Sequence, residues 1–276
     1  MGKNEEPDMT SSELKRVNYH THCRRCRHAR GEASEYAEEA IRKGLSVLGF
    51  SDHLPFPFDR YGGMRMPYAE LEEYLEEITI LKEKLKDRIH ILRGFEGEFI
   101  KSQTKYYECL LSHDQCDYLI FGQHFFETDN ENFLNTYSLD NTEQYEIYAE
   151  SIVEGMRSGY FRYAAHPDLI FVNDHPWDIH CDRACDIIIN GALKYDFALE
   201  YNANGPRQGK RLFADGERDM YPYPGFWDKA EGTGIRVYVG SDCHEPEAVY
   251  DSYVESAYAD LEKRKISVST ELEPLA

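Results

Sequence analysis

The stretch Asn18-Tyr19-His20-Thr21-His22 carries two histidines two positions apart near the N-terminus. Val17 to Thr21 is expected to be a β-strand, and residues i and i+2 of a strand point to the same side, so both imidazoles face one point. There they can bind a single metal ion, although such a pair is more often a surface or packing feature. The rest of the chain decides between these interpretations.

The composition is that of an ordinary folded protein with a hydrophobic core. The chain has 276 residues, of which 41% are hydrophobic and 30% charged, and α/β barrels use such a length as one domain. The net charge of −20 argues against general nucleic-acid binding, because binding to a phosphate backbone requires clustered Lys and Arg. It leaves room for a small phosphate substrate, which one local basic patch can serve.

Neither a membrane span nor a disulfide framework is indicated. No apolar run approaches the roughly 18 residues of a spanning helix, and residues 1–16 lack the apolar core of a signal peptide. Seven cysteines are scattered along the chain, and the Cys23-x-x-Cys26 pair has no second pair of matching spacing. We therefore expect a cytoplasmic protein with reduced thiols and no membrane partner. The sequence does not indicate an oligomeric state.

Strand-like and helix-like segments alternate after a predicted mobile tail over residues 1–12. Strands are expected at 17–21, 47–51, 90–95, 118–122, 161–165, 197–201 and 235–239. Helices are expected at 34–44, capped by Ser34, and at 68–87, 104–113, 142–159, 179–191, 224–231 and 247–263. This alternation predicts a parallel sheet with right-handed crossovers in a single domain over residues 13–276. Leu54 to Pro67 is irregular and is either a lid over a site or a structural surface loop.

Candidate metal ligands follow the predicted strands. Six of the seven strands place His, Glu or Asp at or just beyond their carboxyl ends, and the seventh offers Glu200 with Asn202 and Asn204 after it. Side chains at these ends converge on one face of an α/β barrel. Crowded buried acids and imidazoles cost several kcal/mol unless they are paired or bind metal. A His and carboxylate set without usable cysteines suits Zn²⁺, Mn²⁺ or Fe, and this number of ligands suits more than one ion.

The ordered set of these residues resembles the polymerase-and-histidinol-phosphatase (PHP) family of metal-dependent phosphoesterases. The resemblance runs from about residue 17 to about residue 246 and rests on His20-x-His22, His28, Ser51-Asp52-His53, Glu96, His124, His166-Pro167-Asp168 and Asp242-x-His244. It implies a distorted (β/α)7 TIM-like barrel that binds three divalent metal ions.

The resemblance also implies how the ligands divide among the ions. One ion would lie on His20, His22, Glu96 and Asp242, a second on His124, His166 and a bridging Glu96, and a third on His28, His53 and His244. Glu96 is preferred because it matches the family's Gly-apolar-Glu pattern, and Glu98 is the alternative.

Two further runs are most similar to the stand-alone histidinol-phosphate phosphatases of this family, namely Gly49-Phe50-Ser51-Asp52-His53-Leu54-Pro55 and Glu200-x-Asn202-x-Asn204-Gly205-x-Arg207. They imply hydrolysis of L-histidinol phosphate to L-histidinol and phosphate by in-line attack of a metal-bound hydroxide. Asp242 or His244 would pass a proton to the leaving alkoxide. Arg207 is the predicted phosphate-binding residue, since a guanidinium can bind two oxygens at once.

Other functions remain open at this point. A related phosphatase acting on another small phosphate ester fits the same motifs. An amidohydrolase-like metal hydrolase also begins with H-x-H after its first strand, but it leaves His28, Glu96 and the final Asp-x-His poorly explained. A non-catalytic metalloprotein does not account for irregular loops at the same rim as the ligands, and structural zinc sites favour Cys and one ion.

Overall fold

The computed structural model describes residues 15–58, 62–113, 115–128 and 132–272. The predicted mobile tail, and residues 59–61 of the predicted lid, lie outside these ranges. No helix in the described part of the chain is long and apolar enough to cross a membrane.

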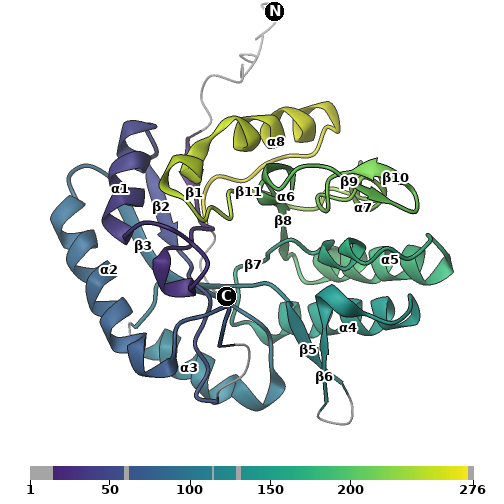
Figure 1. Ribbon diagram of the computed structural model, residues 1–276, viewed down its shortest axis with the longest axis horizontal. Coiled ribbons are helices and arrows are strands. Elements are labelled where there is room, and N and C mark those ends of the chain that lie inside the picture. The colour runs from purple at the N-terminus through teal and green to yellow at the C-terminus, as the bar shows by residue number, and fades with distance from the viewer. Residues whose placement is uncertain (1–14, 59–61, 114, 129–131, 273–276) are drawn as a thin grey trace, which may run out of the picture.

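Seven parallel strands form the centre of the molecule (Figure 1), in the sheet order β1-β2-β3-β4-β7-β8-β11. Their bounds are β1 (Val17–Asn18), β2 (Val47–Phe50), β3 (His90–Gly97), β4 (Tyr118–Phe121), β7 (Tyr163–Ala164), β8 (Ala198–Asn202) and β11 (Val237–Gly240). A parallel bridge between Thr21 and Cys243 joins the segments that follow β1 and β11, and the His22 amide donates to the Cys243 carbonyl at 3.1 Å. The sheet therefore closes almost completely into a barrel, and the predicted fold class is confirmed.

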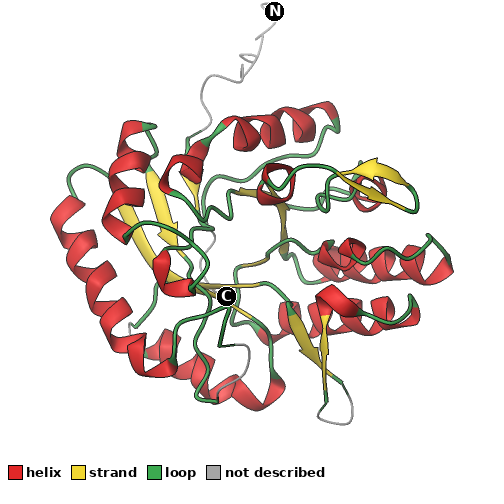
Figure 2. Ribbon diagram, in the orientation of Figure 1, coloured by secondary structure: helices red, strands yellow, loops and turns green. Residues whose placement is uncertain are grey.

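Helices surround the strands on the outside (Figures 1 and 2). They are α1 (Ala33–Arg42), α2 (Leu71–Leu85), α3 (Thr104–Ser112), α4 (Glu143–Ser158), α5 (Ile179–Lys194), α6 (Asn204–Arg207), α7 (Pro224–Ala230) and α8 (Ser252–Lys263). Each long helix buries one apolar face, as Tyr74, Ile78 and Leu81 of α2 do, because apolar residues three or four apart lie on the same side of a helix.

Tyrosines fill the barrel interior beneath the carboxyl ends of the strands. Tyr19, Tyr118, Tyr163 and Tyr238 are all almost fully buried, and the Tyr118 hydroxyl donates to the carbonyls of Tyr19 at 2.8 Å and Phe50 at 3.1 Å. A Cβ at Gly49 would lie 2.3 Å from that hydroxyl. This aromatic layer fills part of the barrel interior with packed side chains.

The helices expected at 34, 68 and 247 begin elsewhere in the structure, and α2 begins at Leu71 after a 3-10 turn over Tyr68–Glu70. The first helix is capped by Glu32 rather than Ser34, because Glu32 and Glu35 form a reciprocal capping box. The last helix begins at Ser252 rather than at residue 247. A 3-10 turn over Pro246–Tyr250 precedes it, and the Asp251 carboxylate accepts from the first amides of the helix.

Two short antiparallel hairpins occupy segments in which no helix or strand is expected from the sequence. β5 (Phe125–Glu127) pairs with β6 (Phe133–Asn135), and β9 (Arg211–Phe213) pairs with β10 (Gly216–Arg218). Each of these strands has three residues, too few to give a recognisable alternation of apolar and polar side chains.

Candidate metal centre

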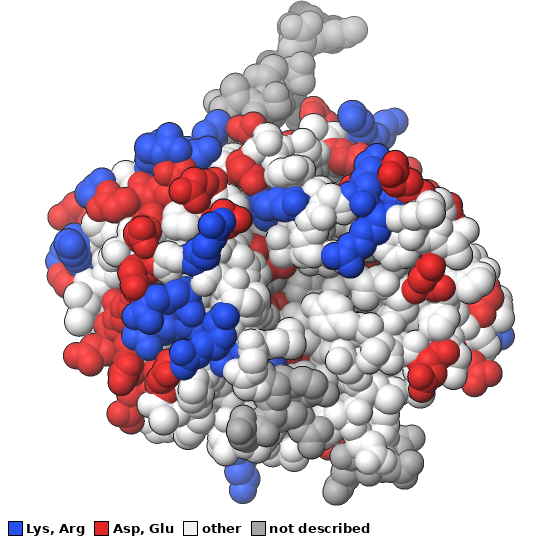
Figure 3. All heavy atoms as spheres, in the orientation of Figure 1, with Lys and Arg blue, Asp and Glu red and all other residues white. Residues whose placement is uncertain are grey.

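All nine predicted ligands come together at the carboxyl ends of the barrel strands. A cavity of about 430 Å³ opens there, lined among others by Glu96, His166 and Asp242. Figure 3 shows a hollow in the middle of this face, with acidic atoms visible at its bottom and basic side chains around it. We divide the ligands into two groups. The outer group is His28, His53 and His244, and the inner group is His20, His22, Glu96, His124, His166 and Asp242.

Four buried donor atoms of the inner group make a compact cage. His20 Nε2 and His22 Nε2 lie 3.1 Å apart, and each lies 3.4 Å from Glu96 Oε2. Asp242 Oδ1 is 3.6 Å from His20 Nε2 and 3.2 Å from His22 Nε2. Ligands about 2.1 Å from a tetrahedral ion are separated from one another by about 3.4 Å. These five distances are those expected between neighbouring ligands of a tetrahedral metal site.

The surroundings of the cage leave its donor atoms available for a cation. His20 Nδ1 contacts Glu200 Oε1 at 2.8 Å, so this nitrogen carries the proton and the lone pair of Nε2 faces the cage. Glu96 Oε2 is buried and makes no hydrogen bond of acceptable geometry within the described residues, although His53 Nδ1 lies 3.0 Å away. A buried carboxylate oxygen without a hydrogen bond is costly unless a cation binds it.

The second oxygen of Glu96 belongs to an adjacent set of donors. Glu96 Oε1 lies 2.8 Å from His166 Nε2 and 3.5 Å from His124 Nε2. His124 Nδ1 contacts Glu98 Oε1 at 2.9 Å, so Nε2 is free to bind metal. Glu96 thus faces the cage with one oxygen and the His124–His166 pair with the other, while Glu98 stands behind His124. This arrangement agrees with the choice of Glu96 over Glu98 as the candidate bridging ligand.

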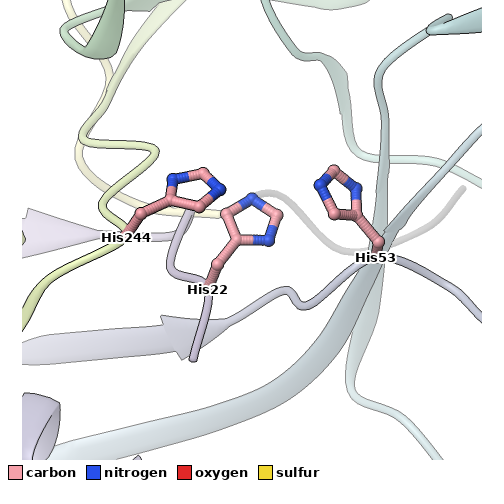
Figure 4. A group of neighbouring side chains, drawn as sticks. All are labelled: His22, His53 and His244. Carbon is pink, nitrogen blue, oxygen red and sulfur yellow. The ribbon is translucent and has the colours of Figure 1, made fainter. Parts of the chain in front are cut away.

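The outer group consists of His28, His53 and His244. The Nε2 atoms of His28 and His244 lie 2.9 Å apart, while their Nδ1 atoms contact the backbone carbonyls of Cys26 and Asp242. Both protons then reside on Nδ1 and the two lone pairs face each other, an arrangement that a shared cation stabilises. Figure 4 shows His22 between His53 and His244, with ring centroids 4.4 Å and 4.5 Å away. His22, a member of the inner group, therefore also borders the outer group.

The two groups differ in their acid–base properties. Burial opposes protonation of His22, but hydrogen bonding to Asp242 and Asp52 raises its pKa to about 9. The buried carboxyl of Asp242 has a pKa well below its usual range because His20, His22 and His244 surround it. In the outer group, burial and the neighbouring His22 lower the pKa of His244 to about 3. Without metal, the inner group tends to hold protons and the outer group excludes them.

Backbone geometry at two candidate ligands is unusual. His166 has φ of 30° and Asp242 has φ of 48°, and side chains in this left-handed region cost about 1–3 kcal/mol. Gly122 approaches the ligands closely, since a Cβ there would lie 2.2 Å from Glu96 Oε1 and 2.6 Å from His166 Cε1. Strained backbone and missing side-chain volume both occur where the candidate ligands converge.

Arg207, the predicted phosphate-binding residue, does not lie in this cavity. Its guanidinium donates to both oxygens of Asp251, at 2.7 Å and 3.0 Å, and to Ser241 Oγ at 2.9 Å. It also donates to the carbonyl of Ser241 and, at 3.1 Å, to that of Ala248. These contacts occupy both edges of the fork, so Arg207 braces the segment that carries Asp242 and is not turned toward a substrate.

Other basic residues surround the cavity, but among the described residues none lines it. Arg25 pairs with Glu77 at 2.8 Å, and Arg30 pairs with Glu245. Lys210 and Arg211 are exposed, follow the cavity-lining Gln208 closely in sequence, and make no ion pair or side-chain hydrogen bond with the described residues. They lie in the same segment as Arg207, which the sequence predicts to bind phosphate, and unlike Arg207 they have no ion-pair partner among the described residues.

Two tyrosines that the sequence analysis did not single out line the cavity, and Asp168 supports the segment of one of them. Tyr137 stacks on His124 with ring centroids 6.3 Å apart, and Tyr221 lies 5.9 Å from the His166 ring. Asp168 accepts from the Tyr223 amide at 2.6 Å and so holds the segment after Tyr221 in place. Tyr137 lies in a 3-10 turn over Thr136–Ser138 and Tyr221 in an irregular segment, and the sequence pattern gives no signal of where either side chain points.

Comparison with known proteins gives a consistent result. A family model for the PHP domain matches residues 18–204. A probable histidinol-phosphatase of Deinococcus radiodurans is 31% identical over 233 residues, which cover 82% of this chain and 85% of that protein. The histidinol-phosphatase of Bacillus subtilis is 25% identical over 267 residues, which cover 86% of this chain and 97% of that protein.

A solved structure shows the same fold. It is the histidinol phosphate phosphatase of Lactococcus lactis, complexed with zinc, L-histidinol and phosphate. The TM-score is 0.67 at 20% sequence identity, and the superposition covers 93% of this chain and 96% of the other.

Proposed function

The chain belongs to the PHP domain family, and from this premise we propose that it is a metal-dependent phosphomonoesterase that hydrolyses L-histidinol phosphate to L-histidinol and phosphate. The two curated relatives of similar length carry the name histidinol-phosphatase. The Lactococcus lactis enzyme of the same fold binds zinc, L-histidinol and phosphate. These relatives support a small phosphate ester as the substrate class and divalent metal ions as cofactors.

The observation that carries this proposal is the cage in which His20 Nε2 and His22 Nε2 lie 3.1 Å apart and 3.2–3.6 Å from carboxylate oxygens of Glu96 and Asp242. We assign the ions as the family resemblance implies: His20, His22, Glu96 and Asp242 would hold one, His124 and His166 with Glu96 a second, and His28, His53 and His244 a third. Supporting this division, Glu96 directs its two oxygens at different sets of histidines.

Phosphomonoester hydrolysis is very slow without a catalyst, so the site must supply a nucleophile and stabilise negative charge. Bound divalent ions lower the pKa of water to near neutrality and neutralise charge on the phosphoryl oxygens. The chain's own side chains orient the reacting groups and transfer protons. Asp242 Oδ2 accepts from the amides of Asn202 at 3.2 Å and Asn204 at 3.3 Å. Asp242 or His244 is the group proposed to take up the proton that the attacking water loses and pass it to the leaving alkoxide.

Phosphate binding by the chain itself is assigned to a different place than the sequence analysis chose. Because Arg207 is committed to Asp251 and Ser241, we propose that Lys210 and Arg211 attract the phosphate dianion to the cavity. The aromatic side chains of Tyr137 and Tyr221, which line the cavity, are proposed to contact the organic part of the ester. The cytoplasmic location and the absence of nucleic-acid partners stay predictions from the sequence.

The direct test is phosphate release from L-histidinol phosphate, compared with a panel of other small monoesters, by protein of measured metal content. We expect L-histidinol phosphate to give the highest kcat/KM and chelation to abolish turnover. Preference for another ester by orders of magnitude would replace the substrate but keep the chemistry. If the protein hydrolyses no ester with zinc, manganese or iron bound, the proposal that it is a phosphomonoesterase is wrong.

A further inference from the structure

A buried arginine that no part of the proposed function uses stands behind one of the candidate ligands. Arg65 has a side chain only 3% exposed and forms a two-pronged ion pair with Glu98, which is fully buried. The Nη2–Oε1 distance is 2.8 Å and the Nη1–Oε2 distance is 3.1 Å. Glu98 Oε1 also contacts His124 Nδ1 at 2.9 Å. A continuous chain of contacts therefore runs from Arg65 to a candidate metal ligand.

Arg65 is itself held firmly in place. Its Nη1 also donates to the Leu54 carbonyl at 2.7 Å, and its guanidinium carbon lies 5.4 Å from the Phe56 ring and 5.3 Å from the Phe125 ring. Planar guanidinium groups stack well on aromatic faces and bind carboxylates through two parallel hydrogen bonds. This geometry leaves Glu98 with one orientation.

The other carboxylates behind the histidines lack such a partner. Glu200 contacts His20 Nδ1 and otherwise accepts from the His166 amide and the Asn202 side chain. Asp52 lies 3.7 Å from His22 Nδ1 and accepts from Cys23. Glu98 alone among these three buried carboxylates is bound by a guanidinium, so any effect of that guanidinium is confined to His124.

We infer that Arg65 is a positioning residue that, through Glu98, fixes the ring and tautomer of His124 so that Nε2 faces Glu96 and His166. The inference rests on the proposed metal centre and adds a residue to it. A histidine that binds metal needs its other nitrogen held by a hydrogen-bond partner, and losing that partner weakens metal binding by about 10–100-fold. Arg65 itself lies in the segment after β2, pairs with Glu98 directly after β3, and through Glu98 reaches His124 after β4.

The test is competition for Zn²⁺ against a chromophoric chelator, which counts ions and measures their affinities without any substrate. For Arg65→Met we expect one ion to bind about 10–100-fold more weakly while the others bind as in wild type. Activity lost by this variant should return when Zn²⁺ is raised in proportion. Arg65→Lys, which keeps the charge but not the fork, should lie between Arg65→Met and wild type.

A matched control is Arg264→Met. Arg264 is also mostly buried and ion-paired, to Asp228, Glu231 and Asp260 on the outside of the barrel. It should lose stability without a selective change at any metal site. Should Arg65→Met fail to fold, Glu98→Gln tests the same contact and should weaken the same ion.

Unchanged Zn²⁺ affinities in folded Arg65→Met or Glu98→Gln would overturn the inference. A uniform loss of all ions in both variants, matching a drop in melting temperature like that of Arg264→Met, would overturn it as well. If the wild-type protein hydrolyses no ester, the proposed function fails, but the Zn²⁺ measurement still tests Arg65.

Discussion

The inner and outer groups of candidate ligands contrast in depth, charge and proton affinity. His20, His22 and Glu96 are almost completely buried. In the outer group the His244 side chain is 21% exposed and His28 lies at the surface, while His53 is buried. The inner group contains carboxylates that pair with its histidines, and the outer group is made of histidines alone. The first can compensate its charges by holding protons, and the second is neutral.

This difference indicates that metal ions compete with protons for the inner histidines but not for the outer ones. An ion that enters the inner group displaces protons from histidines such as His22, whose pKa is raised to about 9. An ion that enters the outer group meets imidazoles that are already neutral, as at His244, whose pKa is lowered to about 3. We therefore expect tight, proton-releasing binding inside and more exchangeable binding at the mouth.

The largest effect is expected from Glu96→Gln, which removes the carboxylate shared by two sets of histidines. Metal contributes several kcal/mol to such reactions, so kcat/KM should fall by about 10³-fold or more. Elemental analysis should show loss of the inner ions. Glu108→Gln, at an exposed carboxylate of α3 that accepts from the Tyr160 hydroxyl, is the control. An E96Q protein that retains all its metal would break the distinction between the groups.

His244→Ala should affect only the outer group. Because a lost ligand costs at least as much as a lost supporting contact, the outer ion should bind about 100-fold more weakly or worse. Zinc titration should then find the inner ions at wild-type affinity and one ion missing. Loss of every ion together would show that the two groups act as one site.

The stability of the metal-free protein should fall on both sides of about pH 6.5. The contribution of His22 is complete below that pH and is lost as the pH rises through about 9. The neutral His244 costs stability as the pH falls from about 6.5 toward 3, because its proton binds only to the unfolded chain. Urea unfolding at pH 5, 6.5 and 9 measures this, and the metal-loaded protein should lose little stability at pH 9.

The smallest effect is expected at the rim. Replacing Lys210 and Arg211 by alanine should lower kcat/KM several-fold at low salt, and the difference should disappear near 0.5 M salt because screening shortens the range of the field. As a control, replacing Lys84 and Lys86, at the C-terminal end of α2, by alanine should have no such effect.

Arg207→Met should lower kcat independently of salt, since Arg207 braces Ser241. A strong salt dependence in R207M would return Arg207 to phosphate binding.

The strands and candidate ligands could be predicted because both are visible as short patterns in the local sequence. Each strand is a short apolar run, and His53, Glu96, His124 and His166 lie at or near strand ends. Convergence of those ends follows from the barrel itself, so a linear pattern became a cluster in space.

What the sequence could not supply are contacts between distant side chains. Arg65 and Glu98 are 33 positions apart, and Arg207 is 44 positions from Asp251. Nothing in the local pattern says that one arginine binds a carboxylate and the other braces a strand end. The predicted role of Arg207 depended on its loop position, and the structure directs its guanidinium elsewhere.

The most direct test of the two-group account is an anomalous-scattering map from crystals grown with zinc. We expect one peak inside the His20–His22–Glu96–Asp242 cage and a second between Glu96, His124 and His166. A third, of lower occupancy after brief chelation, is predicted between His28, His53 and His244. An empty cage, or an outer peak that outlasts the inner ones under chelation, would contradict it.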